Sequence, residues 1–150
     1  MKFSARSDVR VPAEQVFAKF CDYQRHERAA MRRGVNLTRT RTTTTFEPGL
    51  GWDAAVSFRG KIRKFNIELT DVQRNERIDY KIMGRSLRGA GSVEILALSP
   101  SKSRVAYAIE VRPKNFAARL LIQSLRVIKP KLNRKFKRRA QEFTENLVKA

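Results

Sequence analysis

Residue types that support catalysis or metal binding are scarce in this chain. It contains one histidine, His26, and one cysteine, Cys21. A zinc site needs several Cys or His ligands, so these two residues cannot form one. His26 lies in a short polar stretch that is typical of a surface histidine, which makes it a poor general base. Cys21 follows Phe17 by four residues and fits a half-buried packing position better than that of a nucleophile.

The acids and glycines give no stronger signal for an enzyme. Glu68, Glu94 and Glu110 fall on the polar side of alternating segments, where side chains face water. Three glycines between residues 84 and 91 match neither a dinucleotide-binding nor a P-loop spacing and fit bulges or kinks. The sequence therefore predicts no catalytic residue, no metal site and no cofactor, and it favours a noncatalytic protein.

The densest signal is a basic segment at residues 129–139, which holds seven cations and no acid. On a helix, like charges four residues apart cost about 0.2–0.5 kcal/mol per pair, and an anionic surface would offset that repulsion. The segment predicts a polyanion-binding face made of Lys131, Arg134, Lys135, Lys137, Arg138 and Arg139. The partner is an anionic membrane surface or RNA, including the ribosome; the alternative is a solvated face with no partner.

The whole chain is strongly basic. Thirty-three Lys and Arg residues against fourteen Asp and Glu give a formal net charge of +19 and an isoelectric point near 11.2. A charge of this size attracts polyanions such as nucleic acid and anionic lipid headgroups. The alternative is a basic surface that serves solubility alone.

Length and composition indicate one domain spanning residues 1–150. The chain is 41% hydrophobic and 31% charged, which is typical of a folded globular protein. No apolar run approaches the roughly 20 residues needed to cross a bilayer, and residues 1–11 lack the apolar stretch of a signal peptide. Together with a lone cysteine, these features favour the cytoplasm.

Hydrophobic periodicity predicts the elements of this domain. Residues 2–11 alternate as a half-buried strand, and Pro12 stands where a first helix can begin. Asp22 fits the N-cap of a second short helix that Gly34 would end. Alternation and turn residues then predict six strands, within residues 36–46, 52–59, 64–70, 78–82, 87–98 and 104–112.

After residue 113 the period changes from two to about 3.6. One apolar stripe runs along a helix of about 30 residues, and Pro130 should kink or split it. The stripe consists of Leu121, Leu125, Ile128, Leu132, Phe136, Ala140, Phe143 and Leu147. Seven antiparallel strands and one long helix predict an α+β fold in which the sheet curls around the helix.

Four short segments and the last helix carry a resemblance to the SRPBCC, or START-like, superfamily, which includes Bet v 1-like and polyketide cyclase/dehydrase-type proteins. Residues 9–17 resemble its V-x-x-P-x-E-x-V-F opening, and residues 22–25 resemble the D-x-x-R that follows. Residues 58–60, residues 76–78 and the last helix are similar to the branch of coenzyme Q-binding proteins and ribosome-associated toxins. The chain departs from the pattern at residues 26–28, where family members often carry Pro and Trp. The resemblance implies a helix-grip fold, with two short helices after the first strand, and a cavity for a hydrophobic or amphipathic molecule.

Large residues on the inward side of the expected elements are the candidate ligand-binding residues. They are Trp52, Phe58, Phe65, Tyr80, Tyr107, Leu121, Leu125, Ile128 and Leu132. The alternative is that they only fill a packed core. Arg39 and Arg41 share the inward side and would favour an acidic ligand if buried there. A bulge or strand end that turns both arginines to solvent is the favoured interpretation.

Three functional hypotheses follow. The first is a noncatalytic binding or carrier domain for a lipid, quinone or polyketide-like molecule, with a basic helix face for anionic surfaces. The second is an RNA- or ribosome-associating regulator that uses the same basic helix. The third is a cyclase/dehydratase-like enzyme, which would need an acid or base inside the cavity, and strand alternation places none there.

Overall fold

The fold is a curved antiparallel sheet that wraps around a long C-terminal helix. The computed structural model describes residues 1–40, 45–58 and 60–149, and of Phe58 only the backbone. The strands of the sheet lie in the order β1-β7-β6-β5-β4-β3-β2. The strands are β1 (Lys2–Val9), β2 (Asn36–Arg39), β3 (Gly51–Phe58), β4 (Lys61–Gln73), β5 (Arg77–Gly84), β6 (Leu87–Ser99) and β7 (Lys102–Pro113). The predicted helix-grip fold is confirmed.

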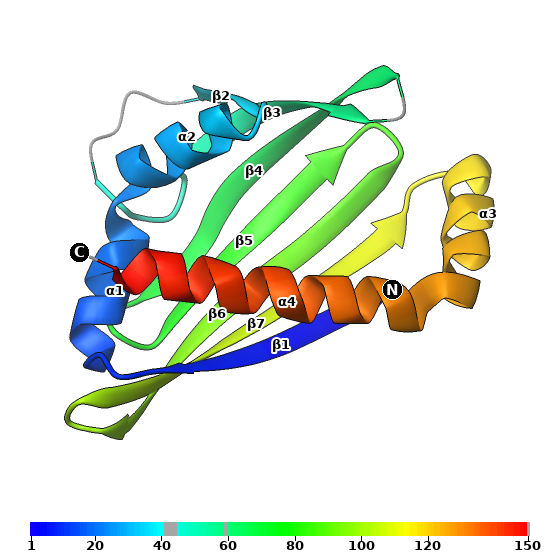
Figure 1. Cartoon of the computed structure of the whole chain (residues 1–150). Coiled ribbons are helices and arrows are strands. Elements are labelled where there is room, and N and C mark those ends of the chain that lie inside the picture. The colour runs from blue at the N-terminus through cyan, green and yellow to red at the C-terminus, as the bar shows by residue number, and fades with distance from the viewer. Residues whose placement is uncertain (41–44, 59, 150) are drawn as a thin grey trace.

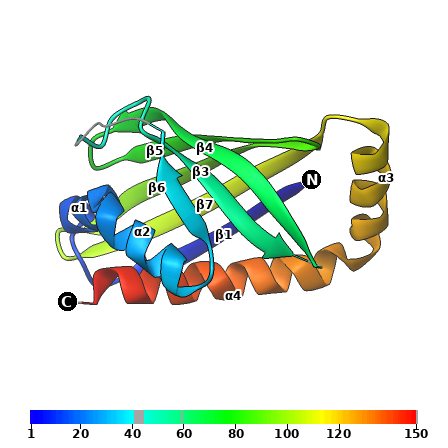
Figure 2. The same cartoon turned by 90° about the horizontal axis from the view of Figure 1, so that it is seen from above.

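The helices gather on one face of the sheet and at its two ends. Helix α4 (Lys129–Val148) crosses the concave face, as both views show (Figures 1 and 2). Helices α1 (Ala13–Cys21) and α2 (Tyr23–Arg32) lie at one end, and α3 (Phe116–Leu125) stands at the other. None of the helices in the described part of the chain is both long and apolar enough to span a membrane.

Local signals in the sequence set the helix ends. The Asp22 side chain accepts a hydrogen bond from the Arg25 backbone N–H and caps α2, as predicted. Gly34 adopts φ +82°, a left-handed conformation that glycine adopts without strain, and its N–H bonds to the Met31 carbonyl after the end of α2. Asn115 caps α3 through the Ala118 N–H at 2.9 Å.

The C-terminal helical segment runs from Phe116 to Val148 and is interrupted just before Pro130. A single 3-10 turn, η1 (Arg126–Ile128), separates α3 from α4, and Pro130 occupies the first turn of α4. Proline lacks the N–H that would bond to the Arg126 carbonyl, and its ring clashes with that carbonyl in a continuous helix. The break turns α3 away from the line of α4 (Figure 1).

The core lies between the sheet and the helices. Val16 of α1 and Leu50, Leu69, Ile78 and Val105 of the sheet region are fully buried. Core members on three strands stand two residues apart, as strand geometry requires. They are Ile67 and Leu69 of β4, Ile78 and Tyr80 of β5, and Val105 and Tyr107 of β7.

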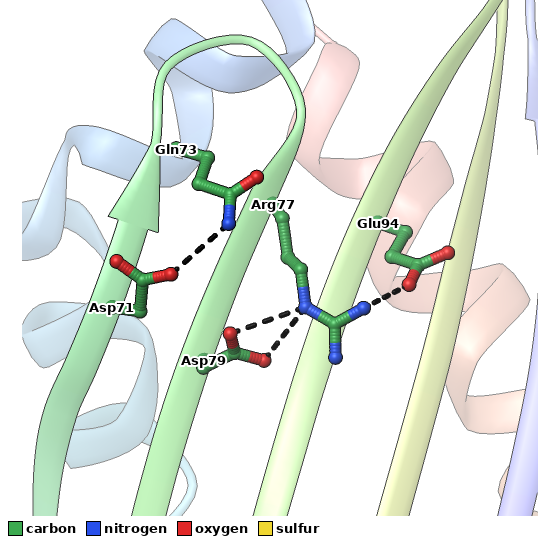
Figure 3. Close-up of polar contacts among 5 residues, drawn as sticks. All are labelled: Asp71, Gln73, Arg77, Asp79 and Glu94. Atoms are coloured by element: carbon green, nitrogen blue, oxygen red, sulfur yellow. Dashed lines mark hydrogen bonds and ion pairs between the residues drawn. The ribbon is translucent and has the colours of Figure 1, made fainter.

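Several acidic residues on the outer face of the sheet are paired with basic ones. Arg77 of β5 donates to both carboxylate oxygens of Asp79 at 2.9 and 3.1 Å and also bonds to Glu94 of β6 (Figure 3). Gln73 donates to Asp71 at 3.1 Å beside this group. The Asp79 and Glu94 carboxylates raise the pKa of Arg77 above its ordinary value.

Candidate functional site

In the described part of the chain, two cavities between the sheet and the helices are candidate sites. The inner cavity, of about 270 Å³, lies under α2 and is lined by residues of α1, α2, α4 and the sheet. The α3-end cavity, of about 660 Å³, lies between α3, the β3–β4 hairpin and the β5–β6 turn. The larger one falls within the range of about 300–1,000 Å³ that is usual for small-molecule sites.

The predicted cavity residues divide between these two spaces. Trp52, Tyr80 and Tyr107 line the inner cavity, and Phe65, Leu121 and Leu125 line the α3-end cavity. The side chain of Phe58 and all of Arg41 lie outside the described residues. The sequence predicts a single apolar stripe on a single helix, so it does not show that the stripe contributes to two cavities. That division depends on the angle between α3 and α4 at η1.

Three predicted cavity residues line neither space. Ile128 is 43% exposed because it ends η1, where the chain turns from α3 into α4. Leu132 is half-buried on α4, the helix that packs against β1. Arg39 ends β2 and pairs with Glu27 of α2 at 3.1 Å, with its guanidinium 5.4 Å from the centre of the Tyr23 ring. Arg39 is exposed at the end of β2, which is the strand-end placement favoured from the sequence, and it does not line the inner cavity.

Aromatic rings form one wall of the inner cavity. Phe20 of α1 lies between Tyr107 of β7 and Phe143 of α4, at centroid distances of 6.3 and 6.0 Å. Tyr107 and Phe143 meet edge to face at 6.3 Å. Such tilted and edge-to-face pairs stabilise a wall built from three separate elements.

Two tyrosines of the inner cavity, Tyr80 and Tyr107, differ in their hydrogen bonds. The Tyr107 hydroxyl lies 2.6 Å from the Thr144 hydroxyl of α4. Because Thr144 donates its own proton to the Ala140 carbonyl at 2.7 Å, Tyr107 is the donor to Thr144. Burial raises the pKa of Tyr107 to about 12.

The Tyr80 hydroxyl has no hydrogen-bond partner among the described residues. Burial raises the pKa of Tyr80 well above its ordinary value. All fully buried side-chain polar atoms in the described part of the chain have hydrogen-bond partners. The Tyr80 hydroxyl is therefore open to the inner cavity and available to a bound molecule.

His26 and Glu27 also line the inner cavity, and the sequence interpretation missed both. His26 is half-buried rather than a surface residue, and its Nε2–H donates to the Lys19 carbonyl at 3.1 Å. Burial lowers the pKa of His26, so the neutral ring is favoured. Strand alternation gives no information on α2, which folds over the open end of the sheet. The strong amphipathic pattern of residues 23–32 is the signal in the sequence that one side of this helix faces the interior.

Glu27 joins α2 to the sheet. Its Oε2 accepts a hydrogen bond from Trp52 Nε1 at 2.8 Å and pairs with Arg39 Nε at 3.1 Å. Trp52 and Arg39 are partners in the β3–β2 register, so the carboxylate bridges two adjacent strands. This half-buried carboxylate is held as an ion pair and serves to fix α2 over the cavity.

The α3-end cavity combines an apolar wall with cations. Its apolar residues include Val56, Phe65 and Leu87, while Lys61, Arg63, Lys64 and Arg85 also line it and no acid does among the described residues. Gly84 leaves room for the Phe65 ring, since a Cβ at this position would lie 2.9 Å from Phe65 Cδ1. A site of this composition fits a molecule with an apolar body and an anionic group.

Hydrogen bonds hold α3 in place as the wall of this cavity. The Lys114 side chain donates to the Gly84 carbonyl at 2.9 Å, and the Lys114 backbone N–H donates to the Ser86 carbonyl at 2.8 Å. Asn115 Nδ2 lies 3.3 Å from Ser86 Oγ. These bonds fix the start of α3 to the β5–β6 turn.

The predicted polyanion-binding residues form an exposed face on α4. Lys131, Arg134, Lys135, Lys137, Arg138 and Arg139 are all exposed, and the ion pairs among the described residues include none of them. We call these six residues the basic face of α4. Groups of three or more His, Cys, Asp or Glu suited to a metal ion are not found in the described ranges.

Comparison with solved structures identifies the fold. No protein-family model and no curated protein matches the sequence. The TTHA0849 protein of Thermus thermophilus is similar over 99% of this chain and 97% of its own, with 13% identity and a TM-score of 0.72. A START superfamily protein of Mycobacterium smegmatis is similar over 89% and 95%, with 14% identity and a TM-score of 0.59.

The Zhui aromatase/cyclase of Streptomyces sp. R1128 is similar over 77% of this chain and 70% of its own, with 12% identity and a TM-score of 0.60. At these identities the likeness establishes the architecture alone. The chain has the START-like helix-grip fold that its sequence resembles.

Proposed function

We propose that this protein is a noncatalytic binding or carrier domain for an amphipathic small molecule, such as a lipid or a quinone- or polyketide-like compound. The observation that carries the proposal is the α3-end cavity, whose apolar wall and four cations suit an apolar body with an anionic end. In this proposal the basic face of α4 brings the domain to an anionic surface.

The inner cavity supports the same function. Its lining is almost entirely apolar, and the Tyr80 hydroxyl that opens to it has no protein partner among the described residues. A bound molecule could form a hydrogen bond with this hydroxyl. A purely packed core would leave the hydroxyl without a partner. The third hypothesis, an enzyme, is less well supported, because His26 and Glu27 are already engaged by Lys19, Trp52 and Arg39.

Native mass spectrometry with palmitate and hexadecanol as probes tests the proposal. We expect wild-type protein to bind both probes. Arg85→Glu should lower the affinity for palmitate by about tenfold and leave the affinity for hexadecanol nearly unchanged, because it reverses one cation of the cavity. Arg88→Glu is the matched control, since Arg88 is exposed and does not line the cavity. Absence of binding of both probes to the wild type, with no lipophilic molecule co-purified, would falsify the proposal.

The basic face of α4 also favours a second candidate function, association with RNA or the ribosome. Six cations on one helix, none of them in an ion pair with the described residues, suit contact with phosphate groups. Sedimentation with ribosomes at low salt that disappears as salt rises would support this function, and lack of sedimentation at low salt would exclude it.

A further inference from the structure

Helix α3 is apolar on opposite sides. Ala118 and Ile122 are buried toward the rest of the domain. Phe116 and Leu120 are four residues apart and share the other side, where Phe116 is 71% exposed. Val127 follows two turns later in η1 and is 84% exposed. Arg119 and Gln123 lie between these two apolar sides, and only the side of Ala118 and Ile122 is buried. An exposed apolar patch of this kind marks a contact with a protein or a membrane.

The β3–β4 hairpin adds a further apolar side chain to this end of the molecule. Ile62 is 72% exposed and lines the α3-end cavity together with Leu121 and Leu125 of α3. The hairpin tip and α3 therefore face each other across one cavity. We call Ile62, Phe116, Leu120 and Val127 the apolar tip.

The chain around the apolar tip carries cations and no acids. Residues 54–67, 80–93 and 111–141, which build the two hairpin ends and the α3–α4 segment, contain no Asp or Glu, and 111–141 alone holds eleven cations. Several acids outside these ranges are paired with cations, as in the Arg77 group (Figure 3). Asp8 and Arg104 form another such pair. Apolar side chains surrounded by unopposed cations are complementary to an anionic lipid bilayer.

We infer that the apolar tip inserts into the headgroup region of an anionic bilayer. A second copy of this chain is a poor occupant, because the contact would bring two sets of cations together in a molecule of net charge +19. Phosphate of RNA would pair with the cations but leave Val127 and Ile62 without an apolar environment. Insertion accounts for the apolar and the charged residues together.

The inference extends the proposed function by assigning the surface that contacts the membrane. Leu121 and Leu125 line the α3-end cavity on the same helix that carries Phe116 and Leu120. Insertion would therefore place this cavity next to the bilayer, where an amphipathic molecule could exchange. Insertion can be measured without any ligand, so the two proposals fail separately.

Co-sedimentation with vesicles tests the inference. The wild type is expected to bind phosphatidylcholine/phosphatidylglycerol vesicles and to bind pure phosphatidylcholine vesicles much more weakly. The variant Phe116→Ser/Val127→Ser removes two exposed side chains and should lower the partition coefficient for anionic vesicles by about tenfold or more. The matched control is Leu96→Ser/Leu98→Ser, which removes two exposed leucines near the β6–β7 turn and should leave binding unchanged.

Three outcomes would overturn the inference. The wild type could fail to bind anionic vesicles at low salt; the two double variants could lose binding equally; or binding could depend on charge alone, with Phe116→Ser/Val127→Ser unchanged and all binding lost at about 0.5 M salt. The last result would match simple adsorption to any polyanion, RNA included. Circular dichroism should confirm that both variants fold, and retained palmitate binding would keep the proposed function while insertion is rejected.

Discussion

At the scale of single residues, the inner cavity shows how identical side chains take different roles. Tyr80 and Tyr107 both lie on inward positions of their strands, and alternation predicts this much from the sequence. The partner of Tyr107 is Thr144, which lies 37 residues later on α4. No local pattern reveals such a contact, because it depends on the position at which α4 crosses the sheet.

The two tyrosines form a matched pair for measuring this difference. Tyr107→Phe removes a hydrogen bond to the buried Thr144 hydroxyl and should lower the free energy of unfolding by about 0.5–1.5 kcal/mol. Tyr80→Phe removes the same atom from the same cavity but breaks no hydrogen bond to the described residues, so its effect should be smaller. Urea unfolding of both variants measures the difference, and equal losses would contradict the assigned hydrogen-bond pattern.

At the scale of elements, strands and helix ends are predictable from the sequence, whereas the angles between elements are not. Residues 36–39 form β2 and the 61–73 segment forms β4, near the expected positions. The placement of α2 over the inner cavity depends on Glu27, whose partners Trp52 and Arg39 lie on two other elements. The site residues of α2 were missed because the sequence alone does not show that contact.

The Glu27 contact gives a prediction for α2 as a unit. Glu27→Ala leaves the Trp52 N–H and the Arg39 guanidinium without their acceptor and should destabilise the protein by about 1–3 kcal/mol. It should also change the fluorescence of Trp52, the single tryptophan. Glu142→Ala is the control, because Glu142 is exposed on α4 and should change neither quantity. Thermal unfolding with fluorescence detection measures both, and matching results for the two variants would refute this role of Glu27.

At the scale of the whole molecule, the net charge is unevenly distributed. Acids pair with cations on the outer face of the sheet, while the α3–α4 segment up to residue 141 has cations alone. The sequence predicts the basic face of α4 because one helix carries it. The apolar tip is different, since it combines a hairpin and a helix that are more than fifty residues apart and meet only in the folded chain.

Charge reversal on α4 tests whether the basic face of α4 attracts anionic membranes, independently of its effect on the stability of the fold. Arg134→Glu/Lys137→Glu/Arg138→Glu should weaken association with anionic vesicles by at least about a hundredfold, since each cation near such a surface contributes about 1 kcal/mol. The same change leaves positions 134 and 138 alike in charge and places an acid at 138, four residues before Glu142, so the free energy of unfolding should stay constant or fall slightly. Arg28→Glu/Arg32→Glu/Arg33→Glu, three reversals at exposed positions on and just after α2, is the control and should weaken association far less. Vesicle titrations over a salt series, combined with urea unfolding, measure both effects. If both variants weakened association equally, the net charge alone would act, and the basic face of α4 would have no special role.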